Sequence, residues 1–149
     1  EFVIVQRVTG PAVTVNAVAT TDQLAALQRA CRSVYVDPSL IQFAVRLVSA
    51  TRTPEKHDLK ELTRFITYGA SPRASINLTE GSRALAMLRG RSYVLPEDMA
   101  DLVPDVLRHR LVLSYEALSE GLSADAIIAK ITAKIPAPAK PLEHEKLAA

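Results

Sequence analysis

Apolar residues recur at spacings of three and four positions over five stretches of the chain, a periodicity that predicts amphipathic α-helices. The predicted helices run from Thr21 to about Tyr35, Asp37 to Arg52, Ser71 to Gly90, Pro96 to about Arg108, and Ser123 to Ile135. Their expected buried faces are Leu24, Leu27, Cys31 and Val34; Leu40, Ile41, Ala44, Val45 and Val48; Ala74, Leu78, Gly81, Leu85 and Leu88; Met99, Leu102, Val103 and Val106; and Ile127, Ile128, Ile131 and Ile135.

Segments rich in β-branched and aromatic residues lie between these helices and favour strands. Leu62–Tyr68 is predicted to be a short strand, and Ser92–Leu95 a second extended piece that could pair with it. Leu111–Ser114 is a further extended stretch, followed by a turn region at Tyr115–Gly121. The predicted fold is therefore mainly α, a bundle of four to five helices with a small β element at Leu62–Tyr68 and Ser92–Leu95.

Three segments carry less regular patterns. Val3–Thr20 holds two β-branched runs interrupted by Gly10-Pro11, which indicates two extended segments around a turn; it could equally be the end of a neighbouring domain followed by a linker. Pro54–Lys60 is expected to be a charged loop. Pro104 would break the hydrogen-bond ladder of its helix, so a kink or two consecutive short helices is expected there.

The start of the third helix carries an unusual charge. Ser71 is a plausible N-cap, and Pro72 suits the first helical position, where a missing N–H costs nothing. Arg73 then falls in the first turn, near the positive end of the helix dipole, with no Asp or Glu in that turn. An arginine placed there costs up to about 1 kcal/mol. A bound anion would offset that cost.

Composition limits where such an anion can bind. The 149 residues, 48% hydrophobic and 23% charged, indicate one soluble globular domain. With 18 basic against 16 acidic residues, the charge is too balanced to indicate nucleic-acid binding through bulk charge. Any anion site must be local. Cys31 is the single cysteine, which excludes an internal disulfide or a Cys-based metal cluster and fits a reducing, cytoplasmic setting. No apolar run approaches membrane-spanning length.

Other candidate sites favour structural interpretations. His57 beside Asp58 has no nucleophile or second ligand nearby, so a solvated loop is favoured over a catalytic pair. Arg108-His109-Arg110 favours placement of cations at a helix C-terminus over a ligand contact. The Walker A loop, G-x-G-x-x-G, H-E-x-x-H, C-x-x-C and G-x-S-x-G patterns do not occur in the sequence, so the chain is not expected to be a self-sufficient enzyme.

The two ends resemble cloning remnants. Glu1-Phe2 is what an EcoRI site encodes, and Lys146–Ala149 resembles a vector polylinker read-through. We therefore expect an excised piece of a longer protein: residues 1–19 comprise the scar, the tail of a preceding domain and a linker, 20–135 form the helical domain, and 136–149 form a stiff Pro-rich tail with vector residues.

Five ordered motifs resemble the C-terminal lid of the MoxR family of AAA+ ATPases. They are Val34–Pro38, Ala50–Arg52, Gly69–Ser75, Gly90–Asp98 and Val106–Leu111, and the resemblance covers about Thr20 to Pro136. Leu95 departs from the family, which more often has Thr or a similar residue before the proline, and this weakens the expected cap of the following helix.

The resemblance implies that Arg73 is the sensor 2 arginine, which reaches the terminal phosphates of a nucleotide held by the base subdomain. Ser71, Pro72 and Arg73 would be this chain's nucleotide-binding residues. Val3–Gly10 resembles the tail of the base subdomain, so Walker A and Walker B would lie upstream of Glu1. ATP and Mg²⁺ are the cofactors implied for the full-length ATPase; no cofactor and no metal are expected on this fragment.

The implied partners are the upstream base subdomain, neighbouring subunits of a hexameric ring and a protein with a von Willebrand factor A domain. The implied function is to couple ATP hydrolysis to chaperone-like remodelling of a partner protein. Two alternatives remain at the level of the sequence: the lid of a magnesium-chelatase-like ATPase, and a free-standing helical module that binds protein or nucleic acid. Salt-dependent DNA binding lost on changing Arg108 and Arg110 would favour the module.

Overall fold

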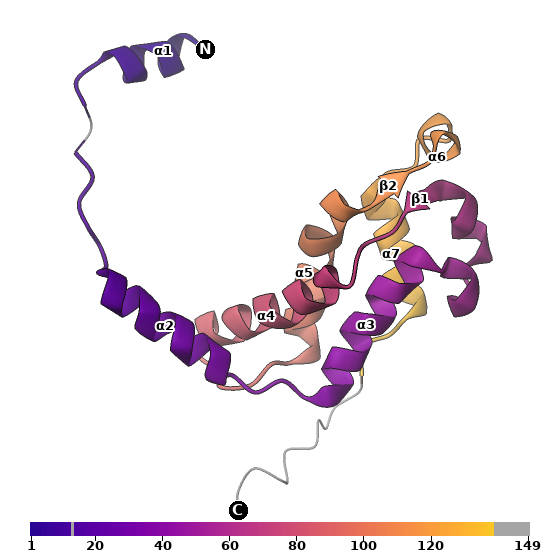
Figure 1. Ribbon diagram of the computed structural model, residues 1–149. Coiled ribbons are helices and arrows are strands. Elements are labelled where there is room, and N and C mark those ends of the chain that lie inside the picture. Colours follow the sequence, from indigo (N-terminus) through magenta and orange to yellow (C-terminus); the bar gives the residue numbers. More distant parts are fainter. Residues whose placement is uncertain (13, 139–149) are drawn as a thin grey trace, which may run out of the picture. The chain divides into compact units, whose positions relative to one another are not determined.

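Four helices pack against one another in the part of the chain that begins at Cys31 (Figure 1). They are α3 (Pro38–Arg52), α4 (Arg73–Leu88), α5 (Pro96–Leu107) and α7 (Ala124–Lys134). Helix α3 contacts each of the other three, and α5 also contacts α4 and α7. The structure is a computed structural model that describes residues 1–12 and 14–138. The mainly α fold predicted from the periodicity is confirmed.

A single hydrophobic core joins the four helices. The predicted inward face of the last helix is confirmed in full, because the three isoleucines of α7 and Ile135, which follows it, are all buried. The largest side chains with no exposed surface come from every helix of the bundle and from the segment that joins α3 to α4: Leu40, Leu47, Leu62, Leu78, Met99, Leu107, Ile127 and Ile131.

The predicted faces of α3 and α4 are partly wrong. On α3, Phe43 and Leu47 are buried, whereas Ile41 and Val45 are 42% and 49% exposed. On α4 the buried row is Ala74, Leu78, Ser82 and Ala86, while Leu88 is 81% exposed. Both helices carry more apolar residues than one buried face can hold, so periodicity alone could not choose among neighbouring rows.

Local capping signals account for most helix ends in this part of the chain. The Asp37 carboxylate accepts a hydrogen bond from Ser39 N at 2.8 Å, and the Ser123 hydroxyl accepts one from Ala126 N at 3.1 Å. Helix α4 ends as predicted near Gly90, whose φ of +75° is the left-handed conformation that glycine adopts without a penalty. The predicted starts of α3 and α7 are therefore confirmed.

Two short 3₁₀ helices occupy the segment predicted as a charged loop and the start of a strand. They are η1 (Pro54–His57) and η2 (Lys60–Phe65). Leu59, Leu62 and Phe65 are all buried at a spacing of three residues, the period of a 3₁₀ helix, and this burial explains why the segment is not extended until Ile66.

The small sheet has a different partner strand from the one predicted. Strand β1 (Ile66–Tyr68) pairs antiparallel with β2 (Val112–Leu113), so the extended stretch expected near Leu111–Ser114 is confirmed, but the pairing with Ser92–Leu95 is wrong. Strand β1 leads into the start of α4, whereas Ser92 follows its end. Sixteen helical residues, about 24 Å of helix, lie between the two segments along the chain, and the backbone of Ser92 and Val94 is hydrogen-bonded to Tyr35 instead.

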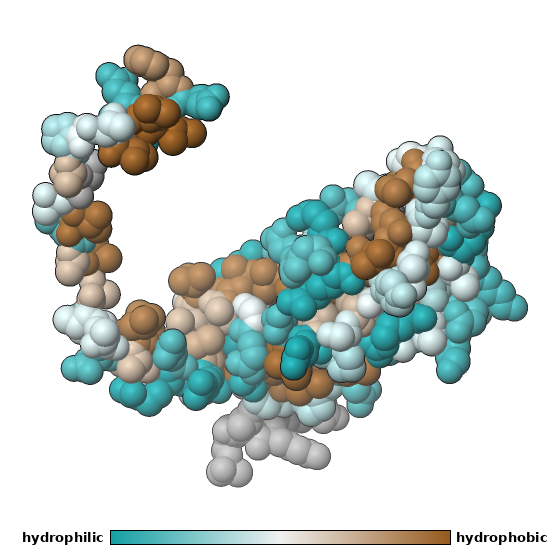
Figure 2. All heavy atoms as spheres, turned by 45° about the horizontal axis from the view of Figure 1, so that its top comes forward, coloured by the Kyte–Doolittle hydropathy of each residue, from teal (hydrophilic) through white to brown (hydrophobic). Residues whose placement is uncertain are grey.

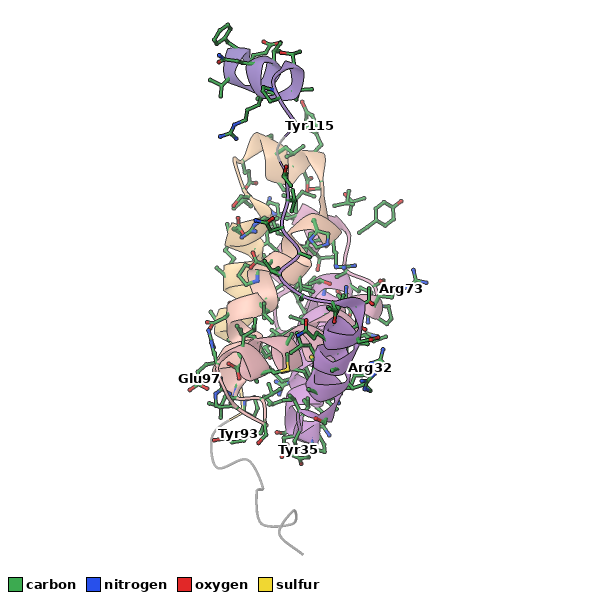
Figure 3. The ribbon with its side chains drawn as sticks, turned by 90° about the vertical axis from the view of Figure 1, so that its left-hand side faces the viewer. Arg32, Tyr35, Arg73, Tyr93, Glu97 and Tyr115 are labelled. Carbon is green, nitrogen blue, oxygen red and sulfur yellow. The ribbon has the colours of Figure 1, made fainter. Side chains whose placement is uncertain are left out.

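Ser92–Leu95 instead makes a local parallel bridge. Tyr35 N donates to Ser92 O at 2.9 Å, and Val94 N donates to Tyr35 O at 2.9 Å. Figure 3 places Tyr35 and Tyr93 close together at one end of this part of the chain. The bridge carries Val94, which is 1% exposed, into the core.

The turn region predicted at Tyr115–Gly121 is corrected. It contains a short helix, α6 (Tyr115–Ser119), because the Ser114 hydroxyl caps it by accepting from Ala117 N at 3.2 Å.

Of the two alternatives expected at Pro104, the pair of short helices is wrong. Helix α5 continues through Pro104 as one element and is followed by η3 (Arg108–Arg110). Ala100, whose carbonyl loses its helical donor to the proline, is an exposed residue, so water can replace that donor.

The unit Glu1–Ala30 has a helix where extended segments were predicted. Helix α1 (Phe2–Thr9) closes its own ladder, beginning with Val5 N to Glu1 O at 3.0 Å. No residue of α1 is buried and no described strand pairs with it, so its β-branched residues have no sheet to join. Val13, from the second predicted strand, lies outside the described residues, and Gly10 to Thr20 is otherwise without regular structure.

Helix α2 (Thr21–Ser33) also starts differently from the prediction. Thr20, not Thr21, is its cap: the Thr20 hydroxyl accepts from Gln23 N, and Gln23 Oε1 accepts from Thr20 N at 2.8 Å. The buried face predicted for this helix is wrong in part among the described residues: Leu24 and Leu27 are each 54% exposed, whereas Val34, just beyond the helix, is buried. Beyond α7, residues 136–138 lack regular structure as expected; Pro141 and Lys146–Ala149 lie outside the described residues.

Candidate functional site

The start of α4 places Arg73 as the first residue of the helix, as the sequence predicts to within one position. Pro72 has helical angles (φ −55°, ψ −22°) and lies immediately before it. The Ser71 carbonyl accepts from Ala74 N at 2.9 Å, but no side-chain hydrogen bond caps the helix. The prediction that the Ser71 hydroxyl caps α4 is therefore wrong, because backbone carbonyls supply the first turn's acceptors.

The Arg73 side chain is exposed, and the first turn of α4 holds no acidic residue. Among residues 1–12 and 14–138, no side chain forms an ion pair with its guanidinium. Figure 3 shows Arg73 at the margin of the molecule, away from the helical core. Five donors of a planar, permanent cation are thus available to an anion at a helix start, where the dipole adds to the same positive field.

The loop before Arg73 is docked on the end of α3. Ala70 N donates to the buried Thr51 hydroxyl at 2.9 Å, and Arg52 Nη1 donates to Ala70 O at 2.7 Å. A Cβ on Gly69 would lie 2.2 Å from Thr51 O, so only glycine permits this approach. Sequence reasoning did not identify the contact between Ala50–Arg52 and Gly69–Ser75. The one feature of the sequence that could have indicated it is Gly69, a glycine just before a helix start.

An open groove of about 500 Å³ runs beside this loop, between α3 and α4. Arg52 and Glu80 supply its charges, and most of its wall is apolar. In Figure 2 hydrophobic side chains gather over α4 and again beside β2, with hydrophilic ones between them. The groove is lined by Ile41, Val45, Arg52, Pro72, Ser75, Ile76, Thr79 and Glu80.

The far end of α4 is held by a buried carboxylate. Asp98 has no exposed surface and accepts from Arg91 Nη2 at 2.5 Å, Arg89 Nη1 at 2.7 Å and Leu95 N at 2.8 Å. Burial by itself would raise the pKa of Asp98, but the hydrogen bonds from Arg91, from Leu95 N and from Arg89 lower that pKa below its ordinary value. This ion cluster, Asp98 with Arg89 and Arg91, ties the end of α4 to the start of α5.

The other candidate groups are used structurally. Arg108 Nε donates to Asp125 at 2.8 Å, and this hydrogen bond, with a second to Asp105, raises the pKa of the guanidinium. Arg110 Nε donates to Val106 O at 2.9 Å. These partners support the prediction that the basic triplet serves the helix end.

His57 and Asp58 have separate partners and do not form a catalytic pair in the described residues. His57 Nε2 lies 3.2 Å from Ser49 Oγ, and Asp58 lies 3.7 Å from Lys134 Nζ. Within the described residues no three His, Cys, Asp or Glu side chains form a group that could hold a metal ion. In the same part of the chain, no helix is long and apolar enough to cross a membrane.

Comparison with known proteins identifies this helical unit. The AAA lid domain family matches residues 59–131, which include β1, α4, α5, β2 and most of α7. Chaperone MoxR1 of Mycobacterium tuberculosis is 40% identical over 119 residues, and protein MoxR of Paracoccus denitrificans is 36% identical over 111 residues. These matches cover 80% and 70% of this chain and 32% of each relative, so the chain spans about a third of their length.

A solved structure agrees with the assignment. The crystal structure of a candidate ATPase from Cytophaga hutchinsonii superposes with a TM-score of 0.80 at 34% identity, over 93% of this chain and 42% of that one. The motifs, the fold and the relatives lead to the same family, and the chain belongs to the MoxR family of AAA+ ATPases, of which it carries the lid.

Proposed function

We propose that this lid closes over ATP bound by an upstream base subdomain and that Arg73 is its sensor 2 arginine. The observation that carries the proposal is the Arg73 side chain: exposed, without an ion-pair partner among the described residues, and fixed at the first residue of α4. Ser71 and Pro72 form the backbone that presents it, and we assign all three to the nucleotide site.

The chemistry follows from the guanidinium. Its planar fork donates two parallel hydrogen bonds to phosphate oxygens and stabilises the charge that develops on a transferring phosphoryl group. ATP with Mg²⁺ supplies the reactive phosphate when bound by the rest of the ATPase; the residues of this chain bind and orient it. Loss of the γ-phosphate would release Arg73 and loosen the lid, which couples hydrolysis to domain motion.

The groove between α3 and α4 supports the same arrangement. Pro72, which precedes α4, and Ile76, in the first turn of α4, both line the groove, so a surface that approaches Arg73 also meets this apolar wall. Ile41, Val45 and Ile76 are 42%, 49% and 60% exposed, and we propose that the base subdomain covers them.

For the intact protein we propose a cytoplasmic ATPase that assembles as a hexameric ring and remodels a partner protein in a chaperone-like way. In that ring the lid would contact its own upstream base subdomain and neighbouring subunits. A protein with a von Willebrand factor A domain is the proposed partner class. The relatives named MoxR favour a MoxR-type ATPase over a magnesium-chelatase-like one, whose lid would work in the same way but whose partner protein would differ. The ion pairs of Arg108 weigh against a nucleic-acid-binding module.

The test is the substitution Arg73→Ala in the full-length ATPase. We expect ATP turnover to fall by about 10²-fold or more, because a transition-state contact is lost, with the thermal unfolding midpoint unchanged. Arg46→Ala is the matched control, since Arg46 is an exposed arginine of α3 outside the groove. Equal turnover of wild type and Arg73→Ala would remove Arg73 from the mechanism. The 149-residue chain alone is expected not to hydrolyse ATP, which a coupled phosphate-release assay measures directly.

A further inference from the structure

The last turn of α3 holds both backbone hydrogen-bonding groups of Ala70. The Thr51 hydroxyl accepts from Ala70 N at 2.9 Å and donates to Val48 O at 2.7 Å. Arg52 Nη1 donates to Ala70 O at 2.7 Å. Two consecutive residues of one helix therefore fix the two peptide groups on either side of a single residue, Ala70, in the loop that leads into the next helix. We call Thr51 and Arg52 with Ala70 the α3 clamp.

The Thr51 side of the α3 clamp is buried and close-packed. Thr51 has no exposed surface and Ala70 is 1% exposed, so water does not compete for Ala70 N, whereas the hydrogen bond from Arg52 to Ala70 O is only partly buried. The absence of a side chain on Gly69 lets the loop backbone lie against the Thr51 carbonyl. Because the hydroxyl both donates and accepts, it has no freedom to rotate away from the amide.

The clamp controls a short, stiff path to Arg73. Only Ser71 and Pro72 separate Ala70 from Arg73, and the ring of Pro72 locks its own φ. The first turn of α4 uses backbone acceptors, with no side-chain cap to orient it independently. A displaced Ala70 peptide would therefore move the start of α4 and the base of the Arg73 side chain.

We infer that Thr51 and Arg52 are positioning residues for Arg73, an inference that rests on the proposed sensor 2 role. They act through the Ala70 backbone and touch no nucleotide. Their contribution is to hold the guanidinium where a phosphate arrives, and a small misplacement of such a group costs up to about 10²-fold in rate.

The test uses the full-length ATPase and a double-mutant cycle. Thr51→Val keeps the shape and removes the hydroxyl, Thr51→Ser keeps the hydroxyl, and Arg52→Met keeps the stem and removes the donor. We expect Thr51→Val and Arg52→Met to slow turnover by about tenfold, and Thr51→Ser to restore it. Thr53→Val is the matched control, since the Thr53 hydroxyl bonds Ser49 O at the same helix end.

The decisive measurement adds each substitution to Arg73→Ala. Residues that act through Arg73 cause no further loss in that background, whereas a general structural role, or direct contact of Arg52 with nucleotide, slows the reaction equally with and without Arg73. Arg52 is exposed, so Arg52→Met keeps the cycle informative if Thr51→Val does not fold.

The outcomes separate the two proposals. If Arg73→Ala has normal turnover, the sensor 2 role fails and the positioning role fails with it. If Arg73→Ala is slow but Thr51→Val and Arg52→Met are normal, or additive with it, only the positioning role is overturned. Amide hydrogen exchange of Ala70 in the 149-residue chain tests the clamp itself: Thr51→Val should speed it by tenfold or more, and unchanged exchange would contradict the clamp.

Discussion

At the scale of single residues, Asp98 is the buried charge on which the junction of α4 and α5 depends. Its two carboxylate oxygens accept four hydrogen bonds from Arg89 and Arg91 side chains and Leu95 N. Such a group is costly to leave unpaired but well compensated here, since each acceptor lone pair has a donor. The sequence placed Asp98 in the first turn of a helix, where acids are favourable, but the two arginines that bury it come from beyond the end of α4.

We predict that Asp98→Asn lowers the free energy of unfolding by about 2–3 kcal/mol at pH 7, because the charge-assisted hydrogen bonds weaken. The pKa of Asp98 is lowered in the folded state, so its stabilisation is complete above the unfolded-state pKa of about 3.9 and is lost as the pH falls through the lower folded value. Urea denaturation at several pH values should therefore show the wild type and Asp98→Asn converging on acidification.

Asp101→Asn is the control for this prediction. Asp101 pairs with Arg89 at 2.7 Å, but both side chains are well exposed, and such surface pairs contribute about 0–1 kcal/mol. A constant difference between wild type and Asp98→Asn from pH 7 to pH 3 would show that the carboxylate charge does not stabilise the fold.

At the scale of elements, the helices could be predicted from residues close together in the sequence, whereas the contacts between distant segments could not. Asp37-Pro38 and Ser123 specify helix starts by side-chain caps within the same few residues, and both predictions hold. The partner of β1 depends on the length and direction of α4, which no propensity of Ser92–Leu95 encodes. Likewise, the α3 clamp joins residues 18 and 19 positions apart, and only the folded chain brings them together.

Helix caps give a direct test at this scale. Ser123→Ala should destabilise the chain by about 1 kcal/mol, because the first turn of α7 loses the acceptor for Ala126 N. Ser71→Ala is the matched substitution at a helix start whose serine makes no capping hydrogen bond, and we expect a change within about 0.3 kcal/mol. Chemical denaturation of both variants checks this; equal losses would mean that Ser71 caps α4 in solution.

At the scale of the whole molecule, the proposed nucleotide site needs residues from outside this chain. The sequence predicted that an anion would be stabilised beside Arg73, since no acidic residue lies in that helical turn. The Walker A pattern of a phosphate-binding loop does not occur in the 149 residues. The lid nevertheless has its own core, because all residues buried in the structure lie between Val34 and Ile135. We therefore expect folding of the lid to be separable from completion of the proposed nucleotide site.

That separation predicts the effect of shortening the chain. Helix α1 buries no residue, and residues 1–12 and 14–19 are all exposed, so their removal takes almost no apolar surface out of the folded core. A chain that begins at Thr20 keeps α2 with its capping threonine and should unfold within about 2 °C of the 149-residue chain, with an unchanged denaturant m-value. Removing residues 124–138 instead takes away the three buried isoleucines of α7 and Ile135, and should abolish cooperative unfolding. Calorimetry of both truncations measures the contrast, and a large loss of stability in the first would show that α1 packs on the lid in solution.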